Sequence, residues 1–424
     1  MRILLTITAM VLAFSANLSA QTDFNTLDKK SYVYYIRGDY KNLKKTAYSM
    51  FSQGIDYYYL RMRLGILAYN KQQYSDALRH FTKALEFNSS DTISREYIYS
   101  GYLFSGRKAD ANLYLESIPR DNKNTTLKSI DKPGLSEIYI GSYAAGYDVT
   151  LYRLNNLNYE AVKNSLSFHA GFESFLSGRF KGTFAYTNYR KAGTVYSASN
   201  PAGTDLNFTQ NQVYVKLTGY IFPGWEFSGF GHVAFYSDVT PHAPLGNGRS
   251  TNQTVTEHLW GVGISKNGWK IRTGANLSLS NFSNSNQIRG EGYLTWLPSG
   301  NLNLYLTSGG MYQSDKNWGK TYQLSQEIGF KIFKSLWLES GIVKGNSFLY
   351  ARIQGYMMNN SFQIPATIIY GNIIILPEKQ FSITVTPFYA ENQSYSWDLN
   401  AYTRTDKLTL NSFGCAIKLI YKNK

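Results

Sequence analysis

Polar and apolar side chains alternate with a period of two from Leu135 onward, and this alternation constrains the fold more than any other feature of the sequence. In the stretch 269–280, Ile271 and Leu277 share one face while Arg272 and Asn276 share the other. Successive side chains of a β-strand point to opposite faces, so the pattern predicts strands with one apolar and one polar face. The same alternation recurs at 212–221, 381–386 and 412–421.

The connections between these strands distinguish a soluble sandwich from a membrane barrel, because strands alternate in both. Tight turns alternate with longer polar loops. This rhythm is typical of an up-and-down membrane barrel with short periplasmic turns and long external loops. The rhythm predicts about 14 antiparallel strands of about 10–14 residues over 135–424, an even number that returns both barrel ends to the periplasm. The tight turns are predicted at Ser177-Gly178, Pro223-Gly224, Asn267-Gly268, Pro298-Ser299-Gly300, Lys334-Ser335 and Pro377-Glu378, and the longer loops at 191–210, 237–254, 344–361 and 390–407.

Residues 1–20 have the pattern of a secretory signal peptide. Arg2 supplies a positive charge, Ile3–Phe14 form an apolar stretch, and small residues precede Gln21. The pattern predicts export and cleavage after Ala20. An apolar stretch of about a dozen residues is too short to cross roughly 30 Å of hydrocarbon as a helix. No later stretch is long and apolar enough to be a helical anchor, so we expect the outer membrane as the location, with strands as the membrane-spanning elements.

Residues 21–120 have helical periodicity, and the stretch 58–91 has a specific spacing within it. Small residues stand where two antiparallel helices would cross, and larger apolar residues would fill the seam between them. The spacing resembles the tetratricopeptide repeat, although Arg61 replaces its usual Trp and Ser89 its usual Pro. The repeat-packing residues are Leu64, Gly65, Tyr74, Ala77, Phe81 and Ala84.

Weaker matches one repeat length away, at Tyr40 and Ala111, predict about three repeats, the minimum for a stable solenoid. The resemblance implies a concave groove that binds proteins or peptides, and hence a periplasmic protein partner. The alternative is a plain helical spacer with an aromatic core. The polar stretch 121–134, which contains Pro133 and Gly134, is predicted to be a linker to the barrel.

The polar faces of the predicted strands carry charged residues that would point into the barrel. One interpretation is a channel with a cationic bias, which would favour anions. The alternative is a structural interior in which these charges pair with one another and plug the barrel. The charges assigned to this face are Glu173, Lys216, Lys270, Arg272, Arg289, Glu291, Glu327, Lys331 and Lys418, with His169 and His232 on the same face.

No recognisable catalytic or cofactor-binding motif occurs in the sequence. The five histidines do not lie in a serine, cysteine or metal-ligand motif, and no phosphate-binding loop or EF-hand pattern is present. We therefore expect no enzyme activity, cofactor or metal. The only cysteine, Cys415, is expected on the apolar outer face. The formal net charge of +15 is not gathered into a Lys/Arg run, so lipid headgroups or an acidic ligand are expected counter-charges rather than nucleic acid.

The predicted fold is therefore an α+β multidomain chain, in which a short tetratricopeptide-like solenoid precedes an up-and-down antiparallel transmembrane β-barrel. This architecture resembles the exopolysaccharide export porins. The resemblance implies that the barrel conducts polymer while the repeats contact periplasmic polymer-modifying proteins. An export or diffusion channel for polysaccharide or anionic solutes is the expected function. The alternatives are a non-conducting scaffold that docks an envelope-assembly or secretion partner, and a barrel enzyme acting on lipid or glycan.

Overall fold

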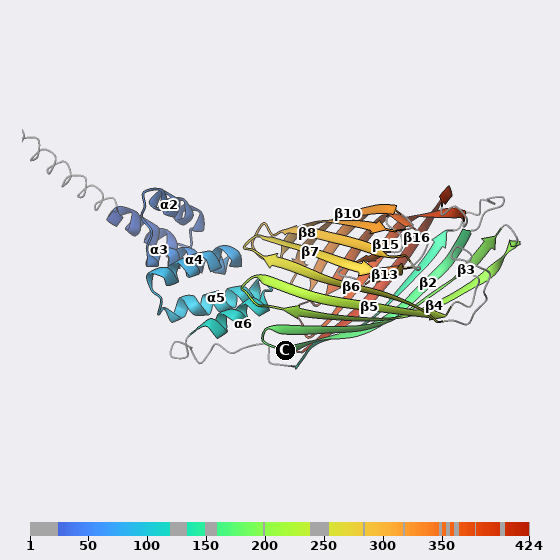
Figure 1. Ribbon diagram of the computed structural model, residues 1–424. Helices are drawn as coiled ribbons and strands as arrows, with labels where there is room; N and C mark the ends of the chain where they lie inside the picture. The colour runs from blue at the N-terminus through green and yellow to red at the C-terminus, as the bar shows by residue number, and fades with distance from the viewer. Residues whose placement is uncertain are drawn as a thin grey trace, which may run out of the picture. The chain divides into compact units, whose positions relative to one another are not determined.

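The described residues form a helical unit followed by a β-barrel unit (Figure 1). The predicted signal peptide, most of the predicted linker and His242 lie outside the described part of the chain. The computed structural model describes residues 24–118, 134–148, 159–197, 200–237, 254–282, 285–316, 319–346, 350–352, 357–359, 364–377, 379–398 and 403–423.

The helical unit consists of successive antiparallel helix pairs. Its second helices begin at Tyr40, Tyr74 and Lys108, and this constant interval equals the roughly 34 residues of a tetratricopeptide repeat. Asp39 caps one of them by accepting a hydrogen bond from the Asn42 backbone N–H at 3.1 Å. The helices are residues 24–36, α2 (Tyr40–Ser52), α3 (Tyr58–Asn70), α4 (Tyr74–Phe87), α5 (Thr92–Phe104) and α6 (Lys108–Ser117).

An apolar core holds the helix pairs together. Leu64, Ala77, Phe81 and Ala84 are almost completely buried in it. A Cβ atom on Gly65 would lie 2.8 Å from the Phe81 ring, so α3 and α4 can approach this closely only at a glycine. The Phe81 ring also stacks on Tyr97 of α5, with ring centroids 4.5 Å apart. The predicted packing residues therefore lie together where α3, α4 and α5 meet.

The barrel unit is a closed sheet of 14 antiparallel strands in which neighbours along the chain pair with each other. Closure joins the first strand to the last, with Glu137 opposite Lys422 and Tyr147 opposite Ser412. The predicted up-and-down barrel of about 14 strands is confirmed. Its strands are β1 (Gly134–Asp148), β2 (Tyr159–Ser177), β3 (Phe180–Ser197), β4 (Asn200–Gly219), β5 (Trp225–Ser237), β6 (Thr254–Asn267), β7 (Ile271–Ser280), β8 (Gln287–Trp296), β9 (Leu304–Asp315), β10 (Gly319–Phe333), β11 (Leu336–Gly345), β14 (Ile364–Ile375), β15 (Phe381–Asp398) and β16 (Thr403–Lys422).

The two ends of the barrel differ in their connections. Each predicted tight turn lies between two paired strands, and all of them lie at the end where β1 begins and β16 finishes. We call this the tight-turn end and the opposite end the long-loop end. A separate hairpin of β12 (Tyr350–Arg352) and β13 (Met357–Asn359) lies in the connection between β11 and β14.

The predicted loop 344–361 lies, after its first two residues, in the connection between β11 and β14, and nearly all of the predicted loop 237–254 lies outside the described residues. Two other predicted loops, 191–210 and 390–407, are wrong, because their described residues are strand. In the first of them, Lys191 pairs with Phe208 and Thr194 with Asp205, so β3 and β4 continue as a paired ribbon. The predicted strand length of about 10–14 residues fits β5 to β9, β11 and β14 but is too short for the other barrel strands, since β4 and β16 each contain 20 residues. A polar sequence conceals such extensions, because the cross-strand hydrogen bonds that hold them are made with residues distant in sequence.

None of the described helices is long and apolar enough to cross a membrane.

Candidate functional site: the barrel interior

The wall of the barrel separates an apolar outside from a polar inside. Large apolar side chains such as Trp260, Val262 and Leu324 are more than half exposed on the outer face. The intervening residues point inward and include most of the charged residues assigned to the polar face from sequence. Alternation along each strand produces this division, because neighbouring side chains lie on opposite sides of the sheet. The interior is therefore the candidate functional site.

A network of lysines and carboxylates lines the interior near the tight-turn end on β2 to β6. The Lys181 ammonium lies 2.8 Å from the Glu173 carboxylate. Lys216, on the next strand, interacts electrostatically with Glu173, Glu226 and Lys181. The Asn267 side chain donates to Glu226 at 2.6 Å. Positive and negative groups thus alternate around this part of the wall and compensate one another.

The same network continues across the closure of the barrel. The Lys418 ammonium lies 4.1 Å from the centre of the Tyr139 ring and interacts electrostatically with Glu137 and Glu173. The His169 ring lies beside Tyr139, with ring centroids 6.3 Å apart. The closing pair of strands, β1 and β16, therefore shares the mixed charge of β2 to β6.

Two of the sequence-assigned charges, Arg289 and Glu291, pair along the same strand. Their charged atoms are 3.3 Å apart, and Arg289 also donates to the Ser278 hydroxyl at 3.0 Å. The Glu291 carboxylate accepts a further hydrogen bond from Asn276 at 3.4 Å. Arg289 is only 3% exposed, so its guanidinium is held within the wall lining by these contacts.

Tyrosines and carboxylates form a second network on the wall from β9 to β15. Tyr305 and Asn372 both donate to the Glu339 carboxylate, the latter at 2.6 Å. Tyr370 donates to Glu327 at 2.6 Å. The phenol and amide donors leave these carboxylates hydrogen-bonded inside the barrel.

The remaining assigned charges take different positions. The Lys331 ammonium lies 5.6 Å from the centre of the Trp337 ring. Arg272 lies on β7, opposite the outward-facing Ile271 in the alternation. Lys270 is not on a strand, because it lies in the tight connection between β6 and β7. Its backbone carbonyl accepts from the Leu297 N–H at 2.8 Å.

The cationic bias inferred from sequence is wrong for the described interior. Inward positions on strands without an obvious alternation carry further carboxylates, and these offset the excess of Lys and Arg. The sequence could have revealed them, because every residue that directly precedes or follows an outward-facing apolar residue on a strand must face inward. The additional inward residues are Glu137, Glu226, Glu257, Asp315 and Glu339, together with the basic Lys181 and Lys191.

An apolar cluster occupies the interior toward the long-loop end. Val162, Leu206 and Phe208 are at most 5% exposed and pack together with Tyr189 and Tyr236. We call this cluster the inner collar. The Lys191 ammonium lies 4.8 Å from the Phe208 ring, so a charged side chain is packed against the collar. The four adjacent strands β2 to β5 contribute these residues, and no local motif predicts the cluster.

Burial inside the barrel changes from one end to the other. Near the tight-turn end the Glu173 and Lys181 side chains are 25% and 23% exposed. Toward the long-loop end Gln210, Gln313 and Glu257 are at most 1% exposed. Gln210, Gln313 and Glu257 are therefore more closely packed than the Glu173–Lys181 ion pair.

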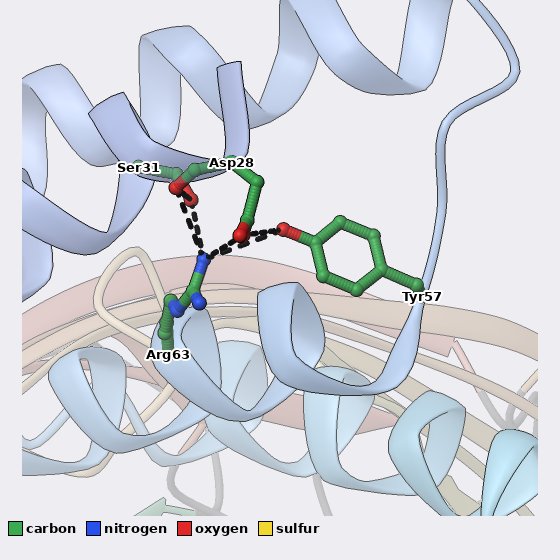
Figure 2. Close-up of polar contacts among 4 residues, drawn as sticks. All are labelled: Asp28, Ser31, Tyr57 and Arg63. Atoms are coloured by element: carbon green, nitrogen blue, oxygen red, sulfur yellow. Dashed lines mark hydrogen bonds and ion pairs between the residues drawn. The ribbon is translucent and has the colours of Figure 1, made fainter. Parts of the chain in front are cut away.

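The helical unit has its own polar network, which links its first helix to α3. Arg63 donates to the Asp28 carboxylate and, at 2.6 Å, to the Ser31 hydroxyl, while the Tyr57 hydroxyl donates to Asp28 (Figure 2). Burial opposes ionisation of Asp28, but the hydrogen bonds from Tyr57 and Arg63 and the charge of Arg63 outweigh it, so its pKa is lowered. Burial and the hydrogen bond to Asp28 raise the pKa of Tyr57 to about 12. These contacts fix helices and offer no reactive group.

Arg61 of α3 makes a comparable set of contacts. It binds the Asp56 carboxylate through two nitrogens at 2.7 and 2.6 Å, and its guanidinium lies 4.1 Å from the Phe51 ring centre. It also contacts the His80 ring at 3.2 Å. Burial, followed by the charge of Arg61, lowers the pKa of His80 to about 4. The planar guanidinium of Arg61 thus packs against the Phe51 ring while it is ion-paired with Asp56.

Within the described part of the chain, no group of three or more His, Cys, Asp and Glu side chains is placed to hold a metal ion. Cys415 is a free and exposed thiol on β16. The chemistry that the described residues offer is the binding of polar groups by hydrogen bonds, charges and aromatic rings.

Neither a family model nor a curated protein sequence matches the chain. Among solved structures, it is similar to a Pseudomonas aeruginosa FadL homologue, at 10% identity and a TM-score of 0.41, covering 69% of this chain and 91% of that one. It is also similar to the Pseudomonas putida toluene transporter TodX, at 7% identity and a TM-score of 0.40, covering 68% and 90%. A bacterial polysaccharide outer membrane secretin gives 11% identity and a TM-score of 0.38, covering 69% and 100%. At these scores no function is transferred from these structures to this chain. The assignment of the barrel fold depends on the strand pairing within the chain itself.

The described fold belongs to the class of closed up-and-down antiparallel barrels with an apolar outer face and a polar interior. A helical unit of paired helices precedes the barrel in the chain.

Proposed function

We propose that the protein is a bacterial outer-membrane β-barrel channel whose N-terminal helical unit lies in the periplasm. One observation carries the proposal: the closed sheet leaves no unpaired edge and turns large apolar side chains outward. In lipid every backbone polar group must be satisfied internally, and a closed barrel achieves this. Large apolar side chains such as Trp260 and Leu324 over the whole outer face are what contact with lipid hydrocarbon favours.

The proposed orientation follows from the connections and the order of the chain. The barrel begins at Gly134 and ends at Lys422, both at the tight-turn end. Short turns are typically periplasmic in bacterial outer-membrane barrels. The predicted signal peptide supplies the export that this location needs. The helical unit precedes β1 and would therefore be periplasmic as well.

The balance of charge in the interior favours a polar, neutral solute over an anion. Positive and negative groups alternate from Glu173 to Glu226, and tyrosines supply both rings and hydroxyl groups on the wall from β9 to β15. Sugar rings present apolar faces and hydroxyl groups, which aromatic and amphipathic side chains bind well. A polysaccharide or oligosaccharide is therefore the proposed cargo, and the inner collar on β2 to β5 is the proposed barrier toward the long-loop end.

Conductance in planar bilayers tests the channel. We expect the wild-type protein to conduct weakly, because hydrophobic constrictions exclude water and ions. Phe208→Ala removes a ring from the inner collar and should raise the single-channel conductance several-fold. Phe235→Ala is the matched control, because Phe235 faces outward and is 39% exposed. A wild-type current that Phe208→Ala leaves unchanged would contradict the collar as the barrier.

A non-conducting scaffold is the second candidate, and the dense packing around Gln210 and Gln313 favours it. In this case the barrel anchors the helical unit, whose constant repeat interval supports a role in docking a periplasmic protein. Absence of current in the wild type and in Phe208→Ala, with both inserted in the bilayer, would make this scaffold the leading function.

A further inference from the structure

The outer wall of the barrel is indented on β5. Two successive outward positions of this strand are glycines, Gly229 and Gly231, and their outward neighbours on β4 and β6 are large. Val262 lies opposite Gly229 and Trp260 lies opposite Gly231. The result is an open groove of about 660 Å³, which is lined by apolar side chains of β4, β6 and β7: Val215, Leu217, Trp260, Val262, Leu277 and Leu279.

The two glycines shape the groove differently. A Cβ atom on Gly231 would lie 2.4 Å from the Trp260 ring, so the indole is seated directly on this glycine. A Cβ atom on Gly229 would meet no atom within 4 Å, so the space above it is open. The groove thus has an aromatic wall at one level and an open floor at the next. Its shape accepts a flexible, narrow, apolar chain.

A cationic site lies on the same outer face, nearer the tight-turn end. Trp225 and Lys266 are cross-strand partners, and the Lys266 ammonium lies 4.5 Å from the Trp225 ring centre. The ammonium donates to the Pro223 carbonyl at 3.3 Å, which occupies one of its three donors. Trp and Lys side chains concentrate where lipid headgroups meet water. Lys266 is therefore placed to bind an anionic headgroup.

The separation of the cation and the groove fits within one lipid leaflet. Val262 is four residues from Lys266 on β6, or about 13 Å along the strand at roughly 3.3 Å per residue. A strand tilt of about 35–45° makes this a depth of about 10 Å. Half of a hydrocarbon layer of roughly 30 Å is about 15 Å. Between them Phe227 and Ile264 face outward as a cross-strand pair. A headgroup on Lys266 would thus lay its acyl chain past Ile264 and into the space over Gly229.

We propose that this groove binds one acyl chain of an anionic phospholipid, whose phosphate is bound by Lys266. The proposal rests on the proposed outer-membrane location. It commits to a phospholipid because Lys266 lies toward the tight-turn end, which is periplasmic in the proposed orientation, and the periplasmic leaflet consists of phospholipids. The bound lipid would therefore occupy a specific site on the wall, distinct from the lipids that surround the rest of the barrel.

Fluorescence quenching by brominated lipid tests the site. The full chain is reconstituted in phosphatidylcholine vesicles that contain a small mole fraction of phosphatidylglycerol brominated on its acyl chains. The Trp260 signal is the difference between the wild type and Trp260→Phe. We expect its quenching to correspond to about fivefold enrichment of the brominated lipid, the effect of one lysine at an anionic lipid surface. Brominated phosphatidylcholine at the same fraction should give no enrichment.

Two variants should abolish the enrichment for different reasons. Gly229→Leu fills the open floor, and Lys266→Gln removes the headgroup charge. Gly146→Leu is the matched control, since Gly146 also faces outward on β1 and an added Cβ would meet no atom within 4 Å. Quenching in proportion to mole fraction in the wild type, or enrichment that persists in Gly229→Leu, would overturn the lipid site alone. Failure of the protein to float with the vesicles would overturn the outer-membrane location, and the lipid site with it.

Discussion

The helical unit and the barrel place their apolar side chains in opposite ways. In the helical unit Phe81 and Leu64 are buried while charged residues such as Lys83 remain at the surface. In the barrel Leu324 is 62% exposed on the outside, whereas Gln323, its neighbour on the same strand, is buried inside. One chain thus contains a unit that buries its large apolar side chains and a unit that turns many of them outward.

This difference identifies which surroundings each part needs. A water-soluble helical array loses stability when a core side chain is removed, because its interior supplies its hydrophobic stabilisation. A membrane barrel draws that stabilisation from contact between its outer face and lipid. Substitution of an apolar residue should therefore destabilise the helical unit at buried positions and the barrel at outward-facing positions. The following predictions test this difference.

The largest effect is expected from Phe81→Ala in the helical unit. Phe81 is fully buried and packs on Gly65 and Tyr97, so its removal leaves a cavity costing about 3–5 kcal/mol. Hydrogen exchange of residues 24–118 in the full chain should accelerate while the barrel strands remain protected. Phe87→Ala, on the same helix at a position 49% exposed, is the control and should change little. Equal exchange in the two variants would contradict the proposed packing.

A somewhat smaller effect is expected from Leu324→Arg on the outer face of β10. An arginine facing the lipid costs roughly 2–4 kcal/mol near the bilayer midplane. Urea unfolding of the barrel in vesicles should report this loss, and Leu324→Phe should leave the midpoint close to that of the wild type. If Leu324→Arg unfolds like the wild type, water rather than lipid surrounds this face.

The smallest effect is a pH dependence confined to the helical unit. The folded pKa of His80 is lowered to about 4, while the unfolded chain takes up its proton near pH 6.5. The unfolded state therefore binds protons first as the pH falls. Stability is fully present above about pH 6.5 and declines toward pH 4, by roughly 1–3 kcal/mol.

His80→Gln should flatten this pH dependence when helical circular dichroism of the full chain is followed through thermal melting. A slope between pH 6.5 and 4 that is identical in both proteins would assign the dependence to other groups. The barrel unit provides an internal reference, because His80 lies on α4 and not in the sheet.

The alternation of residues such as Ile271 and Arg272 predicted the strands, because a period of two is a local feature of the sequence. The order of tight turns and longer loops then predicted the barrel and its strand number. The tight turns were predictable for the same reason, since Pro, Gly and Asn report local backbone geometry. The extensions of β3 and β4 were not predicted, because their outward positions are mostly polar and their few apolar residues, such as Leu206 and Phe208, face inward.

The interior was only partly predictable. The alternation identified inward charges such as Lys216, Arg289 and Glu327. The excess of basic residues inferred from that set is offset by Glu226 and Glu339, which were not assigned to the interior from sequence. Their positions follow from strand register, which depends on partners that the local sequence does not name. The inner collar was missed entirely, because Val162 and Phe208 are brought together by the register of β2 and β4 against β3, which the local sequence does not specify.

The most direct test of the central claim is thiol labelling of intact cells, in a Cys415→Ser background. A cysteine replaces either Lys316, in the described connection between β9 and β10 at the long-loop end, or Ser335, in the tight turn between β10 and β11. Both positions are exposed to solvent. An outer-membrane barrel with periplasmic tight turns predicts that a membrane-impermeant reagent labels the Lys316→Cys protein and leaves the Ser335→Cys protein unlabelled until the outer membrane is permeabilised. The reverse pattern would invert the topology, and labelling of neither before permeabilisation, with the protein recovered in the soluble periplasmic fraction, would contradict the membrane location.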